Sequence, residues 1–329
     1  MCSFPKRKGR GVVRLQAFAL ISVLILVSIL SLVALEFSQR SALHLRMTSN
    51  YSQAKKALYY AYGGYQAALS LLMNDTNGYD GPGDMWYGAL TPVPFGTGSI
   101  AVRIDDEQSR FNVRKLVTEF GFEDKRRSAM LSRLFEKVAV QPSLIGGLVD
   151  WQDSDDLPVP DGAEASFYNS LSPPYAPTNR PLLSIGEILN VRGFERDLFF
   201  LPPASRNPLA SEELAPLSDY LTPYGDGKIN INTAELPVLI SLSADMDDLI
   251  VREIIAKRVE GPFEKIEDLK QVETVSNVLY DEISSLITVK SEAFRITSTG
   301  YAAGFSEVVT AVVLRRSAGV RVVYFNRSL

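Results

Sequence analysis

The stretch AFALISVLILVSILSLVAL, residues 17–35, contains no charged residue, no glycine and no proline. As a helix it is long enough to cross the hydrocarbon core of a bilayer, which is about 30 Å thick. Lysines and arginines are concentrated before it, in residues 6–14, and the first charge after it is Glu36. Basic residues mark the cytoplasmic side of a membrane segment. The sequence therefore predicts a membrane-tethered chain with its N-terminus in the cytoplasm and its bulk on the other side.

The N-terminus leaves three forms of processing open. A cleaved secretory signal has an apolar core of about 7–15 residues, followed by small residues at the cut. The apolar stretch here is longer, and residues 36–40, EFSQR, match a small-x-small site poorly. The chain could instead stay uncut, or a cut between Gly11 and Val12 could remove the basic leader and keep the helix. The last is how prepilins are processed, and the region is similar to a type IV pilin N-terminus.

The helix is expected to continue well beyond the membrane, because residues 14–62 contain neither glycine nor proline. Residues 14–73 would form a helix about 90 Å long at about 1.5 Å per residue. The alternative is an anchor followed by a separate soluble helix, with a kink permitted at residues 63–64. We expect one helix that ends in the turn-forming residues 74–78. Its apolar face repeats every three or four residues, at Leu43, Met47, Tyr51, Ala54, Leu58, Tyr62, Tyr65, Leu69 and Leu72.

Composition excludes several classes of function. The chain has 329 residues, of which 46% are apolar, so the part beyond the membrane can bury a core in more than one domain. Cys2 is the only cysteine and His44 the only histidine. An intramolecular disulfide, a multi-histidine metal site and Ser-His or Cys-His catalysis are therefore excluded. A net charge of −4 argues against broad electrostatic attraction to nucleic acid. We do not expect an enzyme.

Strand-forming segments flank a long helical block. Residues 99–105 alternate as a strand does, and residues 122–138 have the spacing of an amphipathic helix. Helical patterns broken by proline-rich turns continue to about residue 287. Strand-like segments then return at residues 294–298, 307–315 and 320–325, with residues 317–319 as a hairpin turn between the last two. The pattern predicts an α+β domain with a large helical insertion, because two domains in series would leave the first strand without sheet partners.

Five motifs carry a resemblance to a known family. They occur in this order, at residues 104–113 (IDDEQSRFNV), 149–156 (VDWQDSDD), 160–164 (PDGAE, followed by Phe167 and Tyr168), 181–188 (PLLSIGEI) and 225–234 (GDGKININTA). Together with the N-terminus they resemble the K-type minor pseudopilin of bacterial type II secretion, general secretion pathway protein K. The likeness covers nearly the whole chain.

The resemblance implies a pilin-like fold, in which a long N-terminal helix packs on a C-terminal antiparallel sheet. It also implies a large inserted all-α domain of SAM-like or helix-hairpin-helix-like units. We therefore expect a prepilin leader at 1–11, the transmembrane and long pilin helix at 12–73, and the first part of the pilin α/β domain at 74–111. The inserted helical domain is expected at 112–290 and the C-terminal strands of the pilin domain at 291–329.

The resemblance further implies a place in a secretion machine. The chain would sit in the inner membrane with its bulk in the periplasm, and prepilin peptidase would cut after Gly11, leaving Val12 as the mature N-terminus. It would join the I- and J-type minor pseudopilins at the tip of a pseudopilus built from the major pseudopilin on an inner-membrane assembly platform. That tip would start assembly of the fibre that exports folded proteins through the outer membrane.

Gln16 would be the fifth residue after the cut, where most pilins and pseudopilins carry glutamate. That glutamate is thought to pair with the N-terminal amine of a neighbouring subunit. An unpaired carboxylate in a membrane is costly. A tip subunit has nothing ahead of it to supply the partner, so a neutral residue suits that position. The alternative is that Gln16 is only a tolerated interfacial residue.

An acidic run suggests a cation site. Asp153, Asp155, Asp161 and Glu164 occupy positions one, three, nine and twelve of a loop with the ligand spacing of an EF-hand. Position six is Pro158, where an EF-hand needs glycine, so we expect a looser oxygen-ligand Ca²⁺ site. The resemblance adds that K-type pseudopilins can bind calcium. The alternative is a solvated acidic loop in which Asp153 or its neighbour at 150 caps a helix.

Three other functions are alternatives. Residues 229–234, 262–263 and 266–269 also resemble the helix-hairpin-helix unit of membrane-anchored DNA receptors. A DNA-binding hairpin presents a glycine-rich turn to phosphate. The corresponding residues 243–248, SADMDD, have no glycine and three carboxylates, so we expect no nucleic-acid binding. A membrane-anchored enzyme with paired carboxylates is a weaker alternative. A minor tip pilin of a type IV or competence pilus is the closest alternative.

Overall fold

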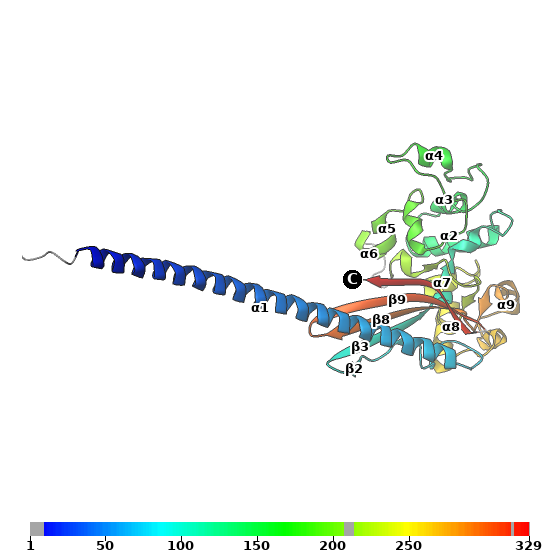
Figure 1. Cartoon of the computed structure of the whole chain (residues 1–329). Coiled ribbons are helices and arrows are strands. Elements are labelled where there is room, and N and C mark those ends of the chain that lie inside the picture. Colours follow the sequence, from blue (N-terminus) through cyan, green and yellow to red (C-terminus); the bar gives the residue numbers. More distant parts are fainter. Residues whose placement is uncertain (1–9, 207–213, 317–318, 329) are drawn as a thin grey trace, which may run out of the picture.

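The computed structural model describes residues 10–206, 214–316 and 319–328 (Figure 1). Its first element is a single helix, α1 (Arg10–Asn74), of 65 residues. At about 1.5 Å per residue this helix is about 97 Å long. It passes through residues 63–64 without a break and ends where the turn-forming run begins. The prediction of one long helix is therefore confirmed.

A six-stranded antiparallel sheet packs against the C-terminal half of α1 (Figure 1). Its main path runs in the order β1-β3-β8-β9-β10, and β2 pairs with β3. Strand β3 is thus an inner strand of the sheet, paired with β8 although the two lie far apart in the sequence. The strands are β1 (Gly88–Ala89), β2 (Val93–Phe95), β3 (Gly98–Asp106), β8 (Ala293–Ala302), β9 (Phe305–Arg316) and β10 (Gly319–Ser328). The four strands expected from alternation are all present.

The helix and the sheet approach each other closely. A Cβ atom on Gly300 of β8 would lie 2.0 Å from the carbonyl oxygen of Ala57 and 2.5 Å from the amide nitrogen of Ala61. Only glycine permits this contact between two backbones. Farther along α1, Tyr65 packs edge-on against Phe325 of β10, with ring centroids 5.7 Å apart. Small residues on α1 and glycine on β8 therefore set the distance between helix and sheet.

Only part of the apolar face of α1 is covered. Leu58, Tyr65 and Leu72 are buried against the sheet. Leu43 and Tyr51 belong to the same repeat, yet they are exposed. The N-terminal half of the helix thus projects from the head as a free rod (Figure 1), with an apolar surface available to another molecule or a membrane.

The segment between β3 and β8 forms a helical block that joins the sheet at the end remote from the free half of α1 and stands above the sheet in Figure 1. Its helix at Lys125–Lys137 begins after Asp124, whose side chain accepts a hydrogen bond from the Arg127 amide. The elements are η1 (Glu107–Ser109), β4 (Phe111–Asn112), η2 (Val113–Leu116), α2 (Lys125–Lys137), α3 (Leu144–Asp150), α4 (Ala165–Asn169), η3 (Ile185–Asn190), α5 (Arg196–Phe200), α6 (Pro203–Arg206), η4 (Leu217–Asp219), β5 (Leu221–Thr222), β6 (Ile229–Asn230), α7 (Leu236–Ile240), α8 (Asp248–Glu260), η5 (Ile266–Gln271), α9 (Asn277–Ile283) and β7 (Ile287–Thr288).

The block is not all-α, which corrects one expectation. Two short parallel pairs, β4 with β5 and β6 with β7, connect segments that are far apart in the sequence. Each pair is only two residues long, too short for its alternation to be recognised in the sequence. The block has its own hydrophobic core, separate from the one between α1 and the sheet. The domain boundaries and the SAM-like nature of the units stay predictions.

Candidate functional site

Three buried carboxylates meet at the end of α3. Asp150 is the last residue of that helix, and the Asp153 amide still donates to the carbonyl of Val149, at 3.0 Å. Glu164 immediately precedes α4. One carboxylate oxygen from each of Asp150, Asp153 and Glu164 lies within 4.8 Å of the other two. Each of these side chains is 4% exposed or less.

A glycine turn brings Glu164 back to the helix end. The carboxylate of Asp150 accepts a hydrogen bond from the Val159 amide at 3.1 Å. Asp161 adopts a φ of +63°, and a Cβ on Gly162 would lie 2.0 Å from the Asp150 Oδ2 atom. A side chain at 162 would therefore displace the Asp150 carboxylate. The motif PDGAE thus folds around Asp150 and places its glutamate beside it.

Four buried oxygens of this cluster lack hydrogen-bond partners. Asp150 Oδ2, Asp153 Oδ1 and both oxygens of Glu164 accept no hydrogen bond from the residues that the structure describes. Burial, together with repulsion from the neighbouring carboxylates, raises the pKa of Asp153 to about 7 and that of Glu164 to about 7. Buried polar atoms are nearly always satisfied in native proteins. Ca²⁺ takes six to eight oxygen ligands, so these carboxylates fit part of a calcium shell.

The structure brings together two of the four predicted ligands. Asp153 and Glu164 are in the cluster, whereas Asp155 and Asp161 are exposed and lie outside it. Asp155 instead accepts a hydrogen bond from the Leu157 amide at 2.8 Å, which closes a local turn. The third member, Asp150, was considered only as a cap. Linear EF-hand spacing does not apply, because the turn at residues 161–162 folds the loop back onto α3.

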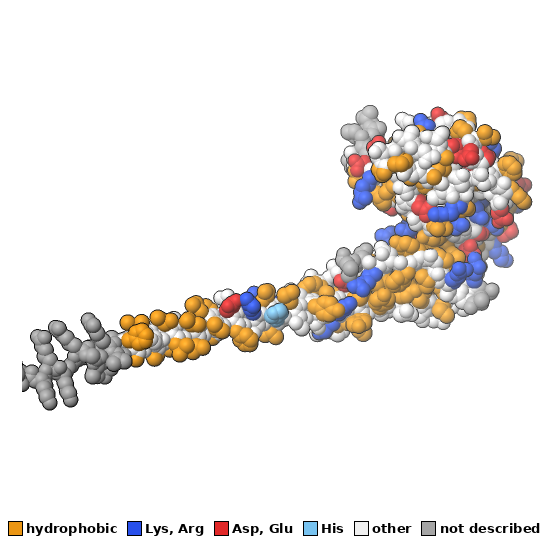
Figure 2. Space-filling view, turned by 45° about the horizontal axis from the view of Figure 1, so that its top comes forward, with side chains coloured by type: hydrophobic (Ala, Val, Ile, Leu, Met, Phe, Trp, Pro, Cys, Tyr) orange, Lys and Arg blue, Asp and Glu red, His pale blue; other side chains and the backbone are white. Residues whose placement is uncertain are grey.

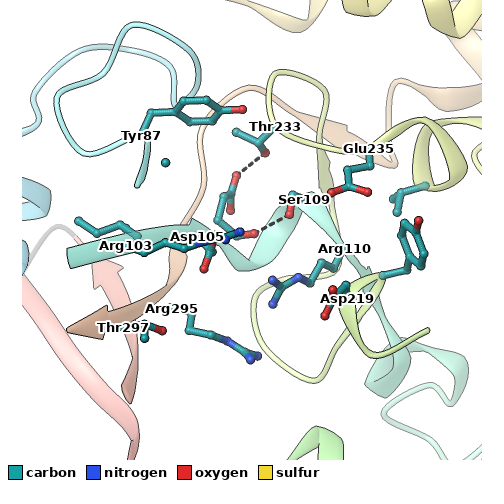
Figure 3. A pocket seen from close by; sticks show the side chains of 15 residues that line it. Tyr87, Arg103, Asp105, Ser109, Arg110, Asp219, Thr233, Glu235, Arg295 and Thr297 are labelled. Atoms are coloured by element: carbon teal, nitrogen blue, oxygen red, sulfur yellow. Dashed lines mark hydrogen bonds and ion pairs between the residues drawn. The ribbon is translucent and has the colours of Figure 1, made fainter. Parts of the chain in front are cut away.

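A polar cleft of about 500 Å³ separates the sheet from the helical block (Figure 3). Beside it, the buried Glu107 accepts from Arg110 Nη1 at 3.0 Å and from Arg295 Nε at 2.6 Å. The hydroxyl of Thr222 also donates to it. Burial disfavours the charged carboxylate, but the two arginines outweigh it and hold the pKa of Glu107 below its ordinary value. The ion pair with Arg295 joins β8 to η1, and the hydrogen bond from Thr222 joins β5 to the same carboxylate.

A second buried acid at this junction explains two of the sequence motifs. Asp106 accepts hydrogen bonds from Thr233 Oγ1 at 2.6 Å, Ser291 Oγ at 2.7 Å, Asn230 Nδ2 at 2.9 Å and the Gln108 amide at 2.8 Å. Two of the donors come from residues 229–234 inside the helical block, a third from Ser291 just before β8, and the fourth from Gln108 just after β3. The motif residues thus fasten the block to the sheet. Sequence reasoning recognised the motifs but not this role.

The predicted processing and assembly residues lie in α1. The backbone of Gly11, Val12 and Gln16 is helical, but their side chains lie outside the described residues. From Phe18 onward the helix is exposed and apolar, with a peak mean hydropathy of 2.9 over an 18-residue window. Figure 2 shows this as a hydrophobic stretch of the rod that ends at charged side chains before the rod reaches the head. By length and composition α1 can cross a membrane, which fits a single-pass anchor.

Comparison with known proteins gives concordant matches. Two family models of type II secretion system protein K match residues 109–200 and 229–290. Type II secretion system protein K of Pseudomonas aeruginosa is 29% identical over 238 residues, covering 68% of this chain and 67% of that protein. The Aeromonas hydrophila protein is 29% identical over 199 residues, 55% of this chain and 60% of that one. The Pectobacterium carotovorum protein is 23% identical over 297 residues, 85% and 87% of the two chains.

The fold also matches a solved structure. A chain in the crystal structure of the GspK-GspI-GspJ complex of enterotoxigenic Escherichia coli superposes with a TM-score of 0.68 at 19% identity. The match covers 87% of this chain and 99% of that one. It shows the same arrangement of a long helix and an antiparallel sheet. On these matches in sequence and fold, the chain belongs to the family of type II secretion system protein K.

Proposed function

We propose that this chain is a non-enzymatic minor pseudopilin at the tip of the periplasmic pseudopilus. It would be anchored in the inner membrane, and prepilin peptidase would cut it between Gly11 and Val12. With the I- and J-type minor pseudopilins it would start a fibre of the major pseudopilin on the inner-membrane assembly platform. The fibre would serve the export of folded proteins across the outer membrane.

The observation that carries this proposal is the division of α1 into a free apolar half and a half packed on the sheet. The free half leaves residues such as Leu43 and Tyr51 uncovered in the single chain. An exposed apolar face of this length is stable only when a membrane or other helices cover it. A subunit that moves from the membrane into a helical fibre core meets both conditions in turn.

The position of the helical block supports a place for this subunit at the tip of the fibre. The block joins the sheet at the end that faces away from the free half of α1, and in Figure 1 it stands above the sheet and widens the head there. In a fibre whose helices run along its axis, the next distal subunit would need that space. A neutral Gln16 agrees with this, because a tip subunit has no neighbour ahead to pair with a carboxylate.

We also propose that a structural Ca²⁺ ion binds Asp150, Asp153 and Glu164. The support is their close approach, their burial and their unpartnered oxygens. The ion would supply the positive charge that this part of the loop lacks, with backbone carbonyls or water completing its shell. It would thereby hold α3 and α4 together.

Co-purification tests the assembly role. Full-length chain in detergent, mixed with the I- and J-type minor pseudopilins of the same organism, should elute with them as one complex. Deleting the gene should block exoprotein secretion and leave twitching intact. No complex, together with a twitching defect and normal secretion, would favour the tip pilin of a type IV or competence pilus.

The DNA-receptor alternative finds little support at its own loop. Asp247 caps α8 by accepting from the Ile250 amide at 2.9 Å. Asp248, in the first turn, pairs with Lys137 Nζ at 2.6 Å. Carboxylates thus occupy the helix N-terminus where a DNA-binding hairpin would receive phosphate. A mobility-shift experiment at low salt should show no retarded band.

A further inference from the structure

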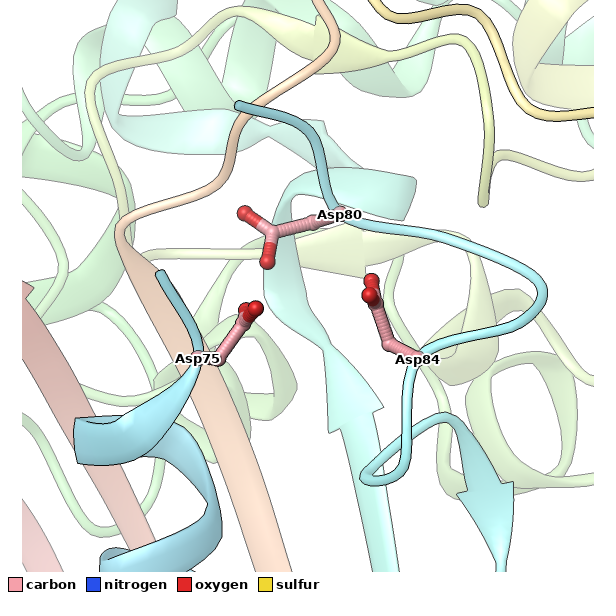
Figure 4. Close-up of side chains that lie close together, drawn as sticks. All are labelled: Asp75, Asp80 and Asp84. Carbon is pink, nitrogen blue, oxygen red and sulfur yellow. The ribbon is translucent and has the colours of Figure 1, made fainter. Parts of the chain in front are cut away.

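A second group of carboxylates lies in the loop that follows α1, far from the calcium candidate. Oxygens of Asp75, Asp80 and Asp84 come within 4.8 Å of one another (Figure 4). Asp84 is engaged within the loop, since it accepts from Asn77 Nδ2 at 2.5 Å and from the Gly81 amide at 2.8 Å. Asp75 and Asp80 face the segment between β7 and β8.

The Lys290 ammonium lies among the oxygens of this loop. Its Nζ atom is 3.3 Å from Asp75 Oδ2, 3.2 Å from Asn77 Oδ1, 3.0 Å from the Tyr79 carbonyl and 3.4 Å from Asp80 Oδ1. Three of these ligands come from alternate residues, two through side chains and the third through its backbone carbonyl. Calcium-binding loops place oxygen ligands at alternate positions in a similar way. The lysine nitrogen thus occupies a position surrounded by the ligand type that a hard cation needs.

The backbone holds Lys290 at this position from both sides. The Asp80 amide donates to the Val289 carbonyl at 2.7 Å, and the Ser291 amide donates to Asp80 Oδ2 at 2.6 Å. Thr288 Oγ1 accepts from the Lys290 amide at 3.1 Å and donates to the Lys290 carbonyl at 2.8 Å. The loop and the lysine are therefore fixed to each other independently of the ammonium contacts.

The buried carboxylate of Asp80 requires a positive charge beside it. Asp80 is fully buried, and its Oδ1 atom accepts no hydrogen bond from the described part of the chain. Lys290 Nζ lies 3.4 Å from that oxygen, while Arg315 pairs with Oδ2 and with Asp75. A buried carboxylate oxygen without a donor is costly unless a positive charge lies beside it.

We propose that residues 75–84 form a cation-binding loop whose resident cation is the Lys290 ammonium, and that the loop takes up a divalent cation when this ammonium is removed. The loop joins the end of α1 to the sheet. At this junction the Lys290 ammonium neutralises the loop carboxylates, so no metal ion is needed there. The stability of the junction is then independent of Ca²⁺, in contrast to the carboxylate cluster in the helical block.

The test is the number of calcium ions bound by the full chain in detergent when Lys290 is replaced by methionine. K290M keeps the aliphatic length of the side chain but removes the charge. The background carries D153N and E164Q, so that the cluster in the helical block does not contribute. Calcium binding is measured by equilibrium dialysis and the melting temperature by circular dichroism. The matched control is K257M, which removes a lysine paired with Glu260 on α8.

We expect K290M to bind one more Ca²⁺ per chain than its background and K257M to bind none more. Ca²⁺ should raise the melting temperature of K290M and leave that of K257M unchanged. D75N added to K290M should abolish the gain. A K290M chain that binds no added Ca²⁺, or that fails to fold with and without Ca²⁺, would overturn the proposal. Neither outcome depends on where the subunit sits in a fibre.

Discussion

Replacing Asp153 by asparagine should change stability in opposite directions with and without calcium. Asp153 is buried beside Asp150 and Glu164, and burial together with their repulsion raises its pKa to about 7. Without a cation the charged form is therefore unfavourable in the folded chain. With a cation the same charge becomes a ligand. The asparagine variant removes both effects at once.

The magnitudes follow from the geometry. Two unit charges 4.8 Å apart repel by about 3.5 kcal/mol at an effective dielectric constant of about 20. Protonation at neutral pH relieves part of this, so D153N should raise the free energy of unfolding in chelator by about 1–3 kcal/mol. At a Ca²⁺ concentration about 100 times the dissociation constant, binding stabilises the wild type by about 2.7 kcal/mol. The variant should lose most of that gain.

Urea unfolding of the full chain in detergent, in EGTA and in millimolar Ca²⁺, measures both effects. The matched control is D155N, which removes a charge from the same loop at an exposed position outside the cluster. D155N should keep the calcium-dependent stabilisation of the wild type. The reasoning fails if D153N is less stable than the wild type in EGTA, or if Ca²⁺ stabilises both equally.

Three further changes test other parts of the structure. Gly300→Ala places a Cβ 2.0 Å from the Ala57 carbonyl oxygen and should lower the free energy of unfolding in urea by about 1–3 kcal/mol. The control Gly261→Ala has open space around its Cβ and should lower it much less. Equal losses would contradict the close approach of α1 to β8. Glu107→Gln should cost about 1.5–3 kcal/mol because it removes the buried charge that pairs with the partly exposed Arg110 and Arg295. Because the folded-state pKa of Glu107 is lowered, its stabilisation is present above about pH 4.5 and is lost as pH falls through the folded-state pKa, so the variant should show a shallower acid loss. Gln16→Glu should impair pseudopilus initiation and secretion, and unaltered secretion would remove the support for a tip role.

The elements that the sequence predicted well have long, uninterrupted patterns. α1 follows from an uncharged stretch and a run without glycine or proline, and β3, β8, β9 and β10 follow from alternation over seven or more positions or from β-branched runs. The strands of two or three residues could not be predicted, because they are too short to show alternation. Four of them, β4 with β5 and β6 with β7, also pair with partners far along the chain. The helix face was predicted, but not that the part around Leu43 lies uncovered.

In the sites too, local sequence predicted some residues, whereas contacts between distant segments determine the others. Asp153 and Glu164 were expected as ligands because acidic residues gather there without a lysine or arginine. Glu164 meets Asp150 and Asp153 because a turn at Gly162 folds the loop back onto the end of α3, which depends on a contact and not on spacing. The contact between Lys290 and Asp75 spans 215 positions, so no local pattern in the sequence points to it.

Locating this subunit in an isolated fibre tests the tip assignment most directly. Phe120 lies on the helical block and is 85% exposed, so F120C in a C2S background offers a single thiol for a gold label. Electron microscopy of pseudopili carrying the labelled chain should show one gold particle per fibre, at one end. Labels spaced along the fibre, or fibres that assemble without any label, would contradict the account.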